Sequence, residues 1–399
     1  MNRFEELIQE LCPKGVEYRH LWEATIWDKR FNSVDRKKQP QIIVYPYLLA
    51  NDLFSLEQPT GDVFLLSTGE KTGWTTTALA ADYLCDGEVV TIPWGKSRPV
   101  EDIIKYYKGK FVTADNRIAT SVDTSVLLNK YLYYWLLSKG KEIDGFYRGS
   151  GIKHPDMSSV LEMRIPLPPL PVQSEIVRIL DSFVALTSEL TSELTSELAA
   201  RKKQYEYYRD SLFTFDDTVQ WLALSEIADI GTGSSNTNEE LGVGDYPFFV
   251  RSQEVRRKNT YEYDETAIIT SGDGVGVGKI FHFVNGKYAL HQRAYRIHIT
   301  DERVLPRYYF YYMKSAFLPY IEKNSFHSSV TSIRRPMLNN FPVPVPAFEK
   351  QRRIVAILDR FDTLCNNIST GLPAEIEARK NQYEYYRDKL LTFKEVTEA

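Results

Sequence analysis

A duplicated segment constrains this chain of 399 residues more than any other feature. Residues 173–215 align with residues 351–393 at a constant offset of 178 and without a gap. Near the end of the two copies, RKKQYEYYRDSLFTF and RKNQYEYYRDKLLTF are identical at 12 of 15 positions. A match of this quality indicates an internal repeat, which decides the architecture before any local pattern does. The fold must therefore place two copies of one element.

Each copy is predicted to be a long helix that follows a proline-rich, extended strip. The strips IPLPPLPVQ and FPVPVPAFEKQ begin at Ile165 and Phe341, and proline keeps the residue before it extended. From about Ser174, apolar residues recur every three or four positions, as in an amphipathic helix. This stripe consists of Ile176, Leu180, Phe183, Leu186, Leu190, Leu194 and Leu198. Such a helix needs an apolar partner, and the second copy, interrupted by a kink or a helix start at Gly371 and Pro373, is the expected one.

The regions before the strips correspond more weakly. Residues 16–23 (VEYRHLWE) resemble residues 219–226 (VQWLALSE), and residues 108–117 (KGKFVTADNR) resemble residues 285–293 (NGKYALHQR). Elsewhere these regions diverge, although strand signals at Ala267–Thr270 and Tyr288–Ile299 and a helix signal at Pro306–Ser315 alternate. The expected fold is α+β or α/β, with two small globular heads separated by two long helices that form an antiparallel, pseudo-twofold coiled coil. The expected boundaries are heads at 1–165 and 217–343, and helical spacers at 166–216 and 344–399.

Composition limits the classes of function. A net charge of −4 argues against a protein that binds nucleic acid by bulk charge, although local basic faces remain possible. No apolar run approaches the ~20 residues of a membrane span, and the first residues lack the apolar segment of a signal peptide. The three cysteines, Cys12, Cys85 and Cys365, are far apart and odd in number. They favour a reducing, cytoplasmic location.

The first helix also contains the tandem block TSEL, three times over Thr187–Leu198. One interpretation is low-complexity helix filler. The other is a ruler, because four residues lengthen a helix by ~6 Å and turn it ~40° beyond a full turn. A DNA base pair turns by about 34–36°. If the heads bind DNA, one TSEL unit would therefore change the geometry between them by about one base pair of twist.

The ends of both copies carry aromatic residues that allow two interpretations. Tyr205, Tyr208, Leu212 and Phe215 share one helical face and fit a coiled-coil core. Tyr207, Arg209 and Asp210 lie off that face but also recur in the second copy, which favours docking of a second protein, since tyrosine and arginine are common interface anchors. The candidate docking residues are Tyr205, Tyr207, Tyr208, Arg209, Tyr383, Tyr385, Tyr386 and Arg387.

Taken together, the two strip-plus-helix copies, the RKKQYEYYRD and RKNQYEYYRD ends, the TSEL block and the divergent heads resemble the specificity subunit of type I restriction–modification systems. The resemblance covers essentially the whole chain. It implies that each head reads one half of a split DNA site. It further implies that the helices dock two methyltransferase subunits that use S-adenosylmethionine, and that restriction subunits using ATP and Mg²⁺ join them. The chain itself is then non-catalytic and needs no cofactor.

The motifs of an enzyme are missing from the sequence. No Asn/Asp-Pro-Pro-Tyr/Phe motif of a DNA methyltransferase occurs, and Ser271–Ile280 departs from a nucleotide-binding loop at Asp273 and Ile280. That loop is read as a glycine-rich turn or as a loop whose amides approach the DNA backbone. His282, His291 and His298 lack partners at metal-binding spacing, so no metal site is expected. A fused nuclease or methylase is therefore disfavoured.

Candidate DNA contacts are cations for phosphates and planar polar groups for base edges. Each charge run is also compatible with an ordinary solvated face. The loops 148–153 and 328–335 rank highest, because both precede a proline strip. The candidates are Lys29, Arg30, Lys37, Lys38, Lys71, Lys96, Arg98, Arg148, Ser150 and Lys153 in the first head, and Arg251, Arg256, Arg257, Lys258, Lys279, Ser328, Ser329, Arg334 and Arg335 in the second. The alternative function is a coiled-coil scaffold whose heads bind proteins or glycans.

Overall fold

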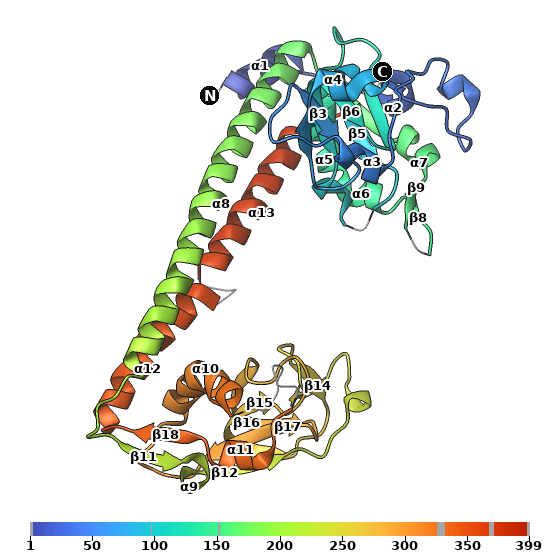
Figure 1. The fold of residues 1–399 in the computed structure, drawn as a ribbon. Helices are drawn as coiled ribbons and strands as arrows, with labels where there is room; N and C mark the ends of the chain where they lie inside the picture. Colours follow the sequence, from blue (N-terminus) through green and yellow to red (C-terminus); the bar gives the residue numbers. More distant parts are fainter. Residues whose placement is uncertain (1–2, 97, 151, 325–331, 367–370, 397–399) are drawn as a thin grey trace. The chain divides into compact units, whose positions relative to one another are not determined.

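The computed structural model describes residues 3–96, 98–150, 152–324, 332–366 and 371–396. It divides into two compact units, which are described separately. Unit 1 comprises residues 1–191 and 377–399, and unit 2 comprises residues 192–376. Each unit contains a globular head and parts of the long helices (Figure 1). We call the part of unit 1 from β1 to β10 head 1, and the part of unit 2 from β11 to β18 head 2.

Head 1 is built on a six-stranded sheet with the order β2-β7-β5-β6-β3-β4. The strands of unit 1 are β1 (Glu17–His20), β2 (Thr25–Trp27), β3 (Val63–Leu66), β4 (Gly73–Thr75), β5 (Cys85–Pro93), β6 (Lys105–Thr113), β7 (Asn116–Ser121), β8 (Tyr147–Arg148), β9 (His154–Pro155) and β10 (Arg164–Leu167). Its helices, apart from the long ones, are α1 (Arg3–Leu11), α2 (Leu21–Ala24), α3 (Ala50–Ser55), α4 (Thr77–Ala80), α5 (Asn129–Ser138), α6 (Gly140–Asp144) and α7 (Met157–Glu162), with short 3-10 helices at Arg36–Lys38, Ala81–Tyr83 and Val100–Asp102.

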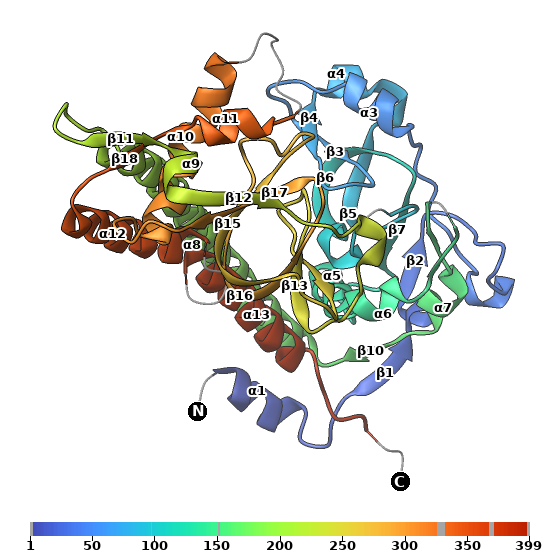
Figure 2. The same cartoon turned by 90° about the horizontal axis from the view of Figure 1, so that it is seen from below.

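Head 2 has a six-stranded sheet with the order β12-β17-β15-β16-β13-β14. Figure 2 labels β12, β17, β15, β16 and β13 of this sheet. Its strands are β11 (Gln220–Ala223), β12 (Ala228–Thr232), β13 (Tyr246–Phe249), β14 (Arg256–Lys258), β15 (Tyr263–Ser271), β16 (Phe281–Leu290), β17 (Ala294–Ile299) and β18 (Pro342–Val345). Its helices are α9 (Leu224–Ile227), α10 (Pro306–Lys323) and α11 (Arg335–Asn339), with a 3-10 turn at Thr237–Glu239.

The two sheets share one topology although the heads differ in sequence. Within each sheet, neighbouring strands are antiparallel except for one parallel pair, and this pair has the same place in both sheets. It is β3 with β6 in head 1 and β13 with β16 in head 2. The anchors found in the sequence take equivalent places. Residues 16–23 and 219–226 form β1–α2 and β11–α9, while residues 108–117 and 285–293 run from β6 and β16 into the next turn. The duplication therefore extends through the heads.

The proline-rich strips are strands of small two-stranded sheets. β10 pairs with β1, and β18 pairs with β11, both antiparallel. Prolines are tolerated here because each strand of such a pair has a free edge, where a missing N–H breaks no ladder. The sequence predicted extended strips but not these partners, which lie more than a hundred residues away along the chain.

The long helix α8 (Leu170–Leu212) runs for 43 residues and belongs to both units. It begins four residues before the predicted Ser174, with Pro171 in its first turn, where a missing N–H is harmless. In unit 1 it lies beside α13 (Leu372–Leu390), with Phe183 and Tyr386 5.9 Å apart between ring centroids. In unit 2 it lies beside α12 (Phe348–Asn366), where the ring of Tyr208 is 5.8 Å from Phe361. The predicted break at Gly371 and Pro373 is a helix start, since α13 begins at Leu372.

Burial along α8 changes with position. Ile176 and Leu180 are fully buried in the core of unit 1, together with residues of α5 such as Tyr131. Within the TSEL block, the apolar stripe becomes half-exposed at Leu190, Leu194 and Leu198. The helix is thus fastened to each head at its ends and less covered in between. No helix in the described part of the chain is long and apolar enough to cross a membrane.

Two buried glutamines fasten the helices to the heads in the same way. Gln173 of α8 donates from Nε2 to the carbonyl oxygens of Val126 (2.7 Å) and Pro168 (2.8 Å), while its Oε1 accepts from the amide of Leu128 (2.9 Å). Gln351 of α12 repeats all three bonds, with Arg303, Pro346 and Leu305 as partners. Both side chains have no exposed surface. The repeat in the sequence therefore also repeats the hydrogen bonds that attach each long helix to its head.

Farther along α8 and α12, one aspartate in each helix also accepts hydrogen bonds from its head. Asp181 accepts hydrogen bonds from Tyr134 (2.6 Å) and Lys130 (2.7 Å) of α5. Asp359 accepts corresponding bonds from Tyr311 (2.6 Å) and Arg307 (3.0 Å) of α10. Identical residues at these positions in both copies are thus explained by contacts inside each unit.

Candidate DNA interface

Four loops of head 1 converge into a cluster, which we call the head 1 loop cluster. It consists of residues 67–71 after β3, residues 94–98 after β5, residues 114–117 around the turn between β6 and β7, and residues 148–154 before α7, leaving aside the undescribed 97 and 151. The amide of Lys96 donates to the carbonyl of Lys153 (3.3 Å). The side-chain amide of Asn116 donates to the carbonyl of Ser67 (3.3 Å). These bonds join loops that are far apart in sequence.

Aromatic and basic groups stack inside this cluster. The Arg117 guanidinium lies 3.8 Å from the ring centroid of Trp94. Trp94 in turn stacks on His154, with centroids 4.4 Å apart and an interplanar angle of 28°. A pocket of about 460 Å³ opens beside them, lined also by Thr68, Lys96 and Ile152. Planar groups with polar edges at the mouth of a pocket suit contacts to bases.

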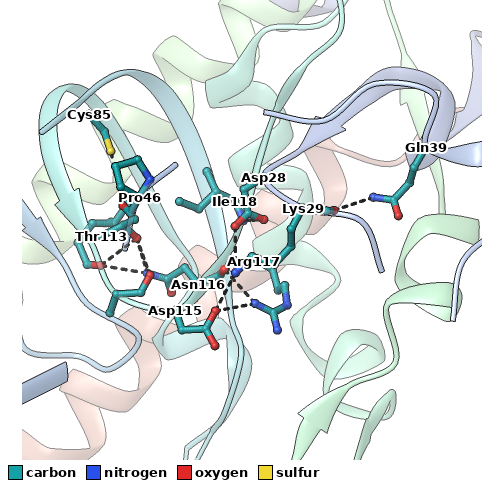
Figure 3. A network of polar contacts seen from close by, with 12 residues as sticks. Asp28, Lys29, Gln39, Pro46, Cys85, Thr113, Asp115, Asn116, Arg117 and Ile118 are labelled. Carbon is teal, nitrogen blue, oxygen red and sulfur yellow. Dashed lines mark hydrogen bonds and ion pairs between the residues drawn. The ribbon is translucent and has the colours of Figure 1, made fainter. Parts of the chain in front are cut away.

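Asp115 lies between two cations in the same cluster (Figure 3). It accepts from Lys29 (2.8 Å) and from Arg117 (2.9 Å). Desolvation acts to raise the pKa of Asp115, but the hydrogen bond from Lys29 and the charge of Arg117 outweigh it, so the pKa lies below its ordinary value. Burial raises the pKa of the neighbouring Asp28, which accepts from the amide of Ile118. Because the Arg117 side chain is only 7% exposed, it supports the cluster from within.

Head 2 contains an equivalent set, the head 2 loop cluster. It comprises residues 250–254 after β13, residues 272–280 after β15, residues 291–293 in the turn between β16 and β17, and residues 332–334 before α11. The amide of Gly272 donates to the carbonyl of Arg293 (2.9 Å), and the amide of Ile333 donates to the carbonyl of Gly272 (2.8 Å). Corresponding bridges, Lys96 with Lys153 and Asp273 with Ser332, join equivalent loops in the two heads.

A carboxylate between two arginines marks the head 2 loop cluster. Asp273 accepts from Arg251 (2.6 Å) and from Arg293 (3.3 Å). The side chains of Arg251 and Arg293 are 41% and 61% exposed, whereas that of Asp273 is 26% exposed. Desolvation acts to raise the pKa of Asp273, but the hydrogen bond and charge of Arg251 and the charge of Arg293 hold it below its ordinary value. The carboxylate of Asp273 therefore stays charged near neutral pH.

The glycine-rich loop of residues 272–280 is a tight turn that forms part of this cluster. Gly274 and Gly278 have φ angles of +82° and +71°, which favour glycine. A Cβ at Gly278 would also lie 2.7 Å from Ile321. At the tip, Val275 is 99% exposed. The glycines thus have a structural cause, and the loop nevertheless lies among the candidate DNA contacts.

The structure brings part of the predicted head 1 set into the loop cluster. Lys71, Lys96, Arg98, Arg148, Ser150 and Lys153 lie in it, and Lys29 reaches it through Asp115. Several of these cations already have acidic partners: Lys71 pairs with Glu57, Lys96 with Asp144 and Arg98 with Glu70. Arg30, Lys37 and Lys38 lie apart from the cluster; Arg30 donates to the carbonyl of Gln39 and Lys38 pairs with Glu162.

The predicted DNA contacts of head 2 also divide into residues in the loop cluster and residues outside it. Arg251, Lys279 and Arg334 lie in or at the loop cluster. Arg256, Arg257 and Lys258 form β14, at the sheet edge, where Arg256 pairs with Glu254 and Lys258 with Glu239. Arg335 donates to the carbonyl of Ile230 (2.5 Å). Ser328 and Ser329 lie outside the described residues.

In the sequence analysis, Asp273 was considered only as part of the glycine-rich loop. Five further residues of the two clusters were not candidates, namely Trp94, Asp115, Arg117, His154 and Arg293. A signal existed for three of them, because the matched anchors 108–117 and 285–293 end at Asp115, Arg117 and Arg293. Nothing in the sequence indicated that these turns would meet the loops after β5 and β15.

The candidate docking residues on the helices differ in exposure. Tyr207 and Tyr385 are 70% and 62% exposed, and Tyr208 and Tyr386 are 41% and 40% exposed. Tyr205 and Arg387 are buried within their own units, and Tyr383 is partly buried. Arg209 pairs with Asp210, and Arg387 with Asp388, at 2.8 Å in both copies. An exposed docking surface is therefore confined to the two Tyr-Tyr pairs, and the buried residues hold the helices to their neighbours.

The comparisons with known proteins agree on one family. The family model described as the type I restriction modification DNA specificity domain matches residues 45–200 and 217–378. The chain is 36% identical over 308 residues to the EcoR124I/EcoR124II specificity subunit of Escherichia coli, covering 69% of this chain and 74% of that protein. It is 32% identical to a putative type I specificity subunit of Haemophilus influenzae, covering 78% of this chain and 84% of that one.

Solved structures show the same fold at low sequence identity. A structure from work on complex assembly and conformational transition of the type I R-M system has a TM-score of 0.61 at 14% identity, covering 96% of this chain and 98% of that chain. The S subunit of a type I restriction-modification system from M. genitalium has a TM-score of 0.51 at 16% identity, covering 94% of this chain and 96% of that chain. Two heads with long helices are thus an arrangement found in other proteins.

Proposed function

Because the chain belongs to the family of type I restriction–modification DNA specificity subunits, we propose that it reads a bipartite DNA sequence, one half with each loop cluster. Membership makes the chain a DNA-recognition subunit that works with other subunits. It gives no support to the alternative of a scaffold whose heads bind proteins or glycans. The single observation that carries the proposal is a shared sheet topology with loop clusters of different chemistry.

The chemistry of the loop clusters supports two different half-sites. Head 1 presents a Trp94–His154 stack beside a pocket, and head 2 presents exposed arginines around Asp273. Phosphate contacts position a protein on DNA, whereas base contacts specify the sequence. Equivalent loops with unlike side chains therefore place both heads on DNA in the same way but select different bases.

The helices serve as spacer and docking surface in this proposal. The domains are the heads 1–165 and 217–343 and the spacers 166–216 and 344–399. Tyr207 and Tyr208 on α8, and Tyr385 and Tyr386 on α13, are exposed copies of one motif. Exposed tyrosines are favoured interface anchors, so each copy docks one methyltransferase subunit, and restriction subunits join that core.

The chain itself is proposed to be non-catalytic and free of cofactors. S-adenosylmethionine, ATP and Mg²⁺ belong to the partner subunits in this proposal. The residues of this chain bind DNA, orient it and hold the methyltransferase subunits against it.

Methylation mapping across a genome, with the chain present and absent, tests the proposed function. The expected result is a motif of two defined halves separated by an unspecified gap, which disappears without the chain. A single undivided motif, or an unchanged methylation pattern, would contradict the proposal.

Matched variants assign the halves to the heads. Lys153→Ala removes an exposed cation from the head 1 loop cluster, and Arg334→Ala removes one from the head 2 loop cluster. If these groups contact phosphates, each variant weakens DNA binding and makes it less dependent on salt, with a slope smaller by about one. Lys14→Ala, an exposed cation after α1, is the control. Equal binding by all three variants at several salt concentrations would remove these loops from the interface.

A further inference from the structure

The arginines of the head 2 loop cluster are arranged for recognition of a base edge. Arg251 comes from the loop after β13 and Arg293 from the turn before β17, yet both donate through Nη1 to the carboxylate of Asp273. A guanidinium has five N–H donors in a fixed plane. One bond to Asp273 restricts the orientation of each guanidinium and, among the residues that the structure describes, leaves its other donors without a recorded hydrogen bond. Both side chains remain substantially exposed, at 41% and 61%.

Asp273 is itself held in place by its loop. Its carbonyl accepts from the Ser271 hydroxyl (2.8 Å), and it forms a bridge with Ser332. The following Gly274 adopts a φ of +82°, which turns the chain away directly after the carboxylate. His291 adds no charge, because burial and the two arginines lower its pKa below its ordinary value, and its Nδ1 accepts from the amide of Arg293 (3.0 Å).

A carboxylate between two guanidiniums suits a base better than a phosphate. Phosphate binding needs positive charge and tolerates a flexible cation such as lysine. A carboxylate beside the arginines would repel the phosphate backbone. In the major groove, by contrast, guanine offers O6 and N7 as acceptors for a guanidinium, and its cytosine partner offers an amino donor for a carboxylate.

Resting on the function proposed above, we propose that Arg251, Asp273 and Arg293 make head 2 specific for a guanine, whose O6 and N7 accept from an arginine guanidinium. Asp273 is a positioning residue that directs the two guanidiniums. In head 1, Asp115 also lies between two cations, but its arginine, Arg117, is only 7% exposed and lies against Trp94. The two half-sites therefore differ in how guanine is read.

Modified DNA tests the proposal without altering the protein. The full chain, assembled with its methyltransferase subunits, is bound to duplexes in which each guanine of the head 2 half-site is replaced in turn by 7-deazaguanine, which lacks the N7 acceptor. We expect one replacement to weaken binding by about 5- to 150-fold, the range of a good bidentate contact. A head 2 half-site without guanine, or equal binding to every substituted duplex, would overturn the proposal.

Protein variants identify the residues. Arg251→Lys and Arg293→Lys keep the charge but lose the planar fork, and at least one is expected to relax the motif at the same guanine. Asp273→Asn is expected to relax that position while leaving the head 1 half-site unchanged, an effect that general unfolding would not produce. Arg303→Lys, another exposed arginine paired with a carboxylate, Asp301, but outside the loop cluster, is the control.

The possible outcomes separate this proposal from the one on which it rests. If the wild-type complex yields no bipartite motif, the proposed function fails. If the bipartite motif is present but Lys variants bind every sequence as the wild type does, the arginines contact phosphates, and the guanine assignment fails alone. A uniform loss of affinity across all duplexes for the Asp273→Asn variant would also reject a role in base selection.

Discussion

Gln173 and Gln351 are single side chains on which the joint between helix and head depends. Each uses its amide to satisfy two carbonyl oxygens and one backbone N–H of the head, and neither has exposed surface. Buried backbone groups that lose their partner destabilise a fold by about 1–3 kcal/mol each. The sequence showed that both glutamines begin the repeat, but not which distant loops they would bind.

Gln173→Leu, which keeps the size of the side chain, is therefore expected to lower the free energy of unfolding by roughly 2–4 kcal/mol. Chemical denaturation followed by circular dichroism measures the change. Gln9→Leu, at an exposed position of α1, is the control and should change stability by less than about 0.5 kcal/mol. Similar effects of both substitutions would show that the three hydrogen bonds contribute little.

His282 makes the stability of head 2 depend on pH. Burial lowers its pKa below the ordinary 6.5, although its ring hydrogen-bonds the carbonyl of Ser252 (3.0 Å), which acts in the opposite direction. Below pH 6.5 the unfolded chain binds this proton more readily than the folded one, so stability falls as the pH falls through that value. His282→Gln should flatten this dependence in urea unfolding at about pH 7.5 and pH 5.5. The same slope in both proteins would contradict this assignment.

At the scale of residues, sequence reasoning could use only the charge of a side chain and its position in the chain. Arg251 and Lys96 were predicted as candidates because they are cations in loops, and both lie in the loop clusters. Arg293 and Trp94 were missed because their role depends on a turn and a loop that meet only through the sheet. Lys38 and Lys258 were predicted on the same grounds but lie outside the loop clusters. Each pairs with an acidic residue, as Lys96 also does.

At the scale of elements, the TSEL block forms part of a continuous helix, since α8 extends without a break from Leu170 to Leu212. Its leucines are half-exposed, so the block is held by fewer contacts than the ends of α8. A change in its length can therefore be accommodated without disrupting either core. This property is what the ruler hypothesis requires.

Deletion of residues 191–194, one TSEL unit, is expected to shorten the gap between the two half-sites by about one base pair. It removes ~40° of helix rotation beyond a full turn, close to the twist of one base pair, and bending absorbs the excess of its ~6 Å length. Both half-sites should stay the same. Methylation mapping reads the gap directly. Ser192→Ala, which retains the helix length, is the control. A deletion variant with an unaltered gap would mean that the block is only helical filler.

The elements themselves were predictable to different degrees. The long helices followed from the spacing of apolar residues, and the start of α13 followed from Gly371 and Pro373. The strand signal across Tyr288–Ile299 was wrong as one strand, because the turn at His291–Arg293 divides it into β16 and β17. The pairing of proline strips with β1 and β11 could not be read from the sequence, since pairing is set by contacts between remote segments.

At the scale of the whole molecule, the duplication gives the sheet topology and the helix attachments of one unit a counterpart in the other. The end of the second copy returns to head 1, where the amide of Val16 donates to the carbonyl of Lys394 (2.9 Å). The first copy leads into head 2. In the proposed function, two copies of a docking motif, each next to its own head, bind two partner subunits of one kind.

Tyr207→Ala and Tyr385→Ala test this stoichiometry. Because both tyrosines are largely exposed, their loss should leave folding intact but weaken the docking of one methyltransferase subunit by roughly tenfold or more. Each single variant should bind one methyltransferase subunit tightly and the double variant none, as measured by sedimentation or native mass spectrometry. Tyr83→Ala, at an exposed tyrosine of head 1, should still bind two. If one single variant lost both partners, the two surfaces would act as one site. The duplicated motif would then not provide two independent docking sites, although the fold is duplicated.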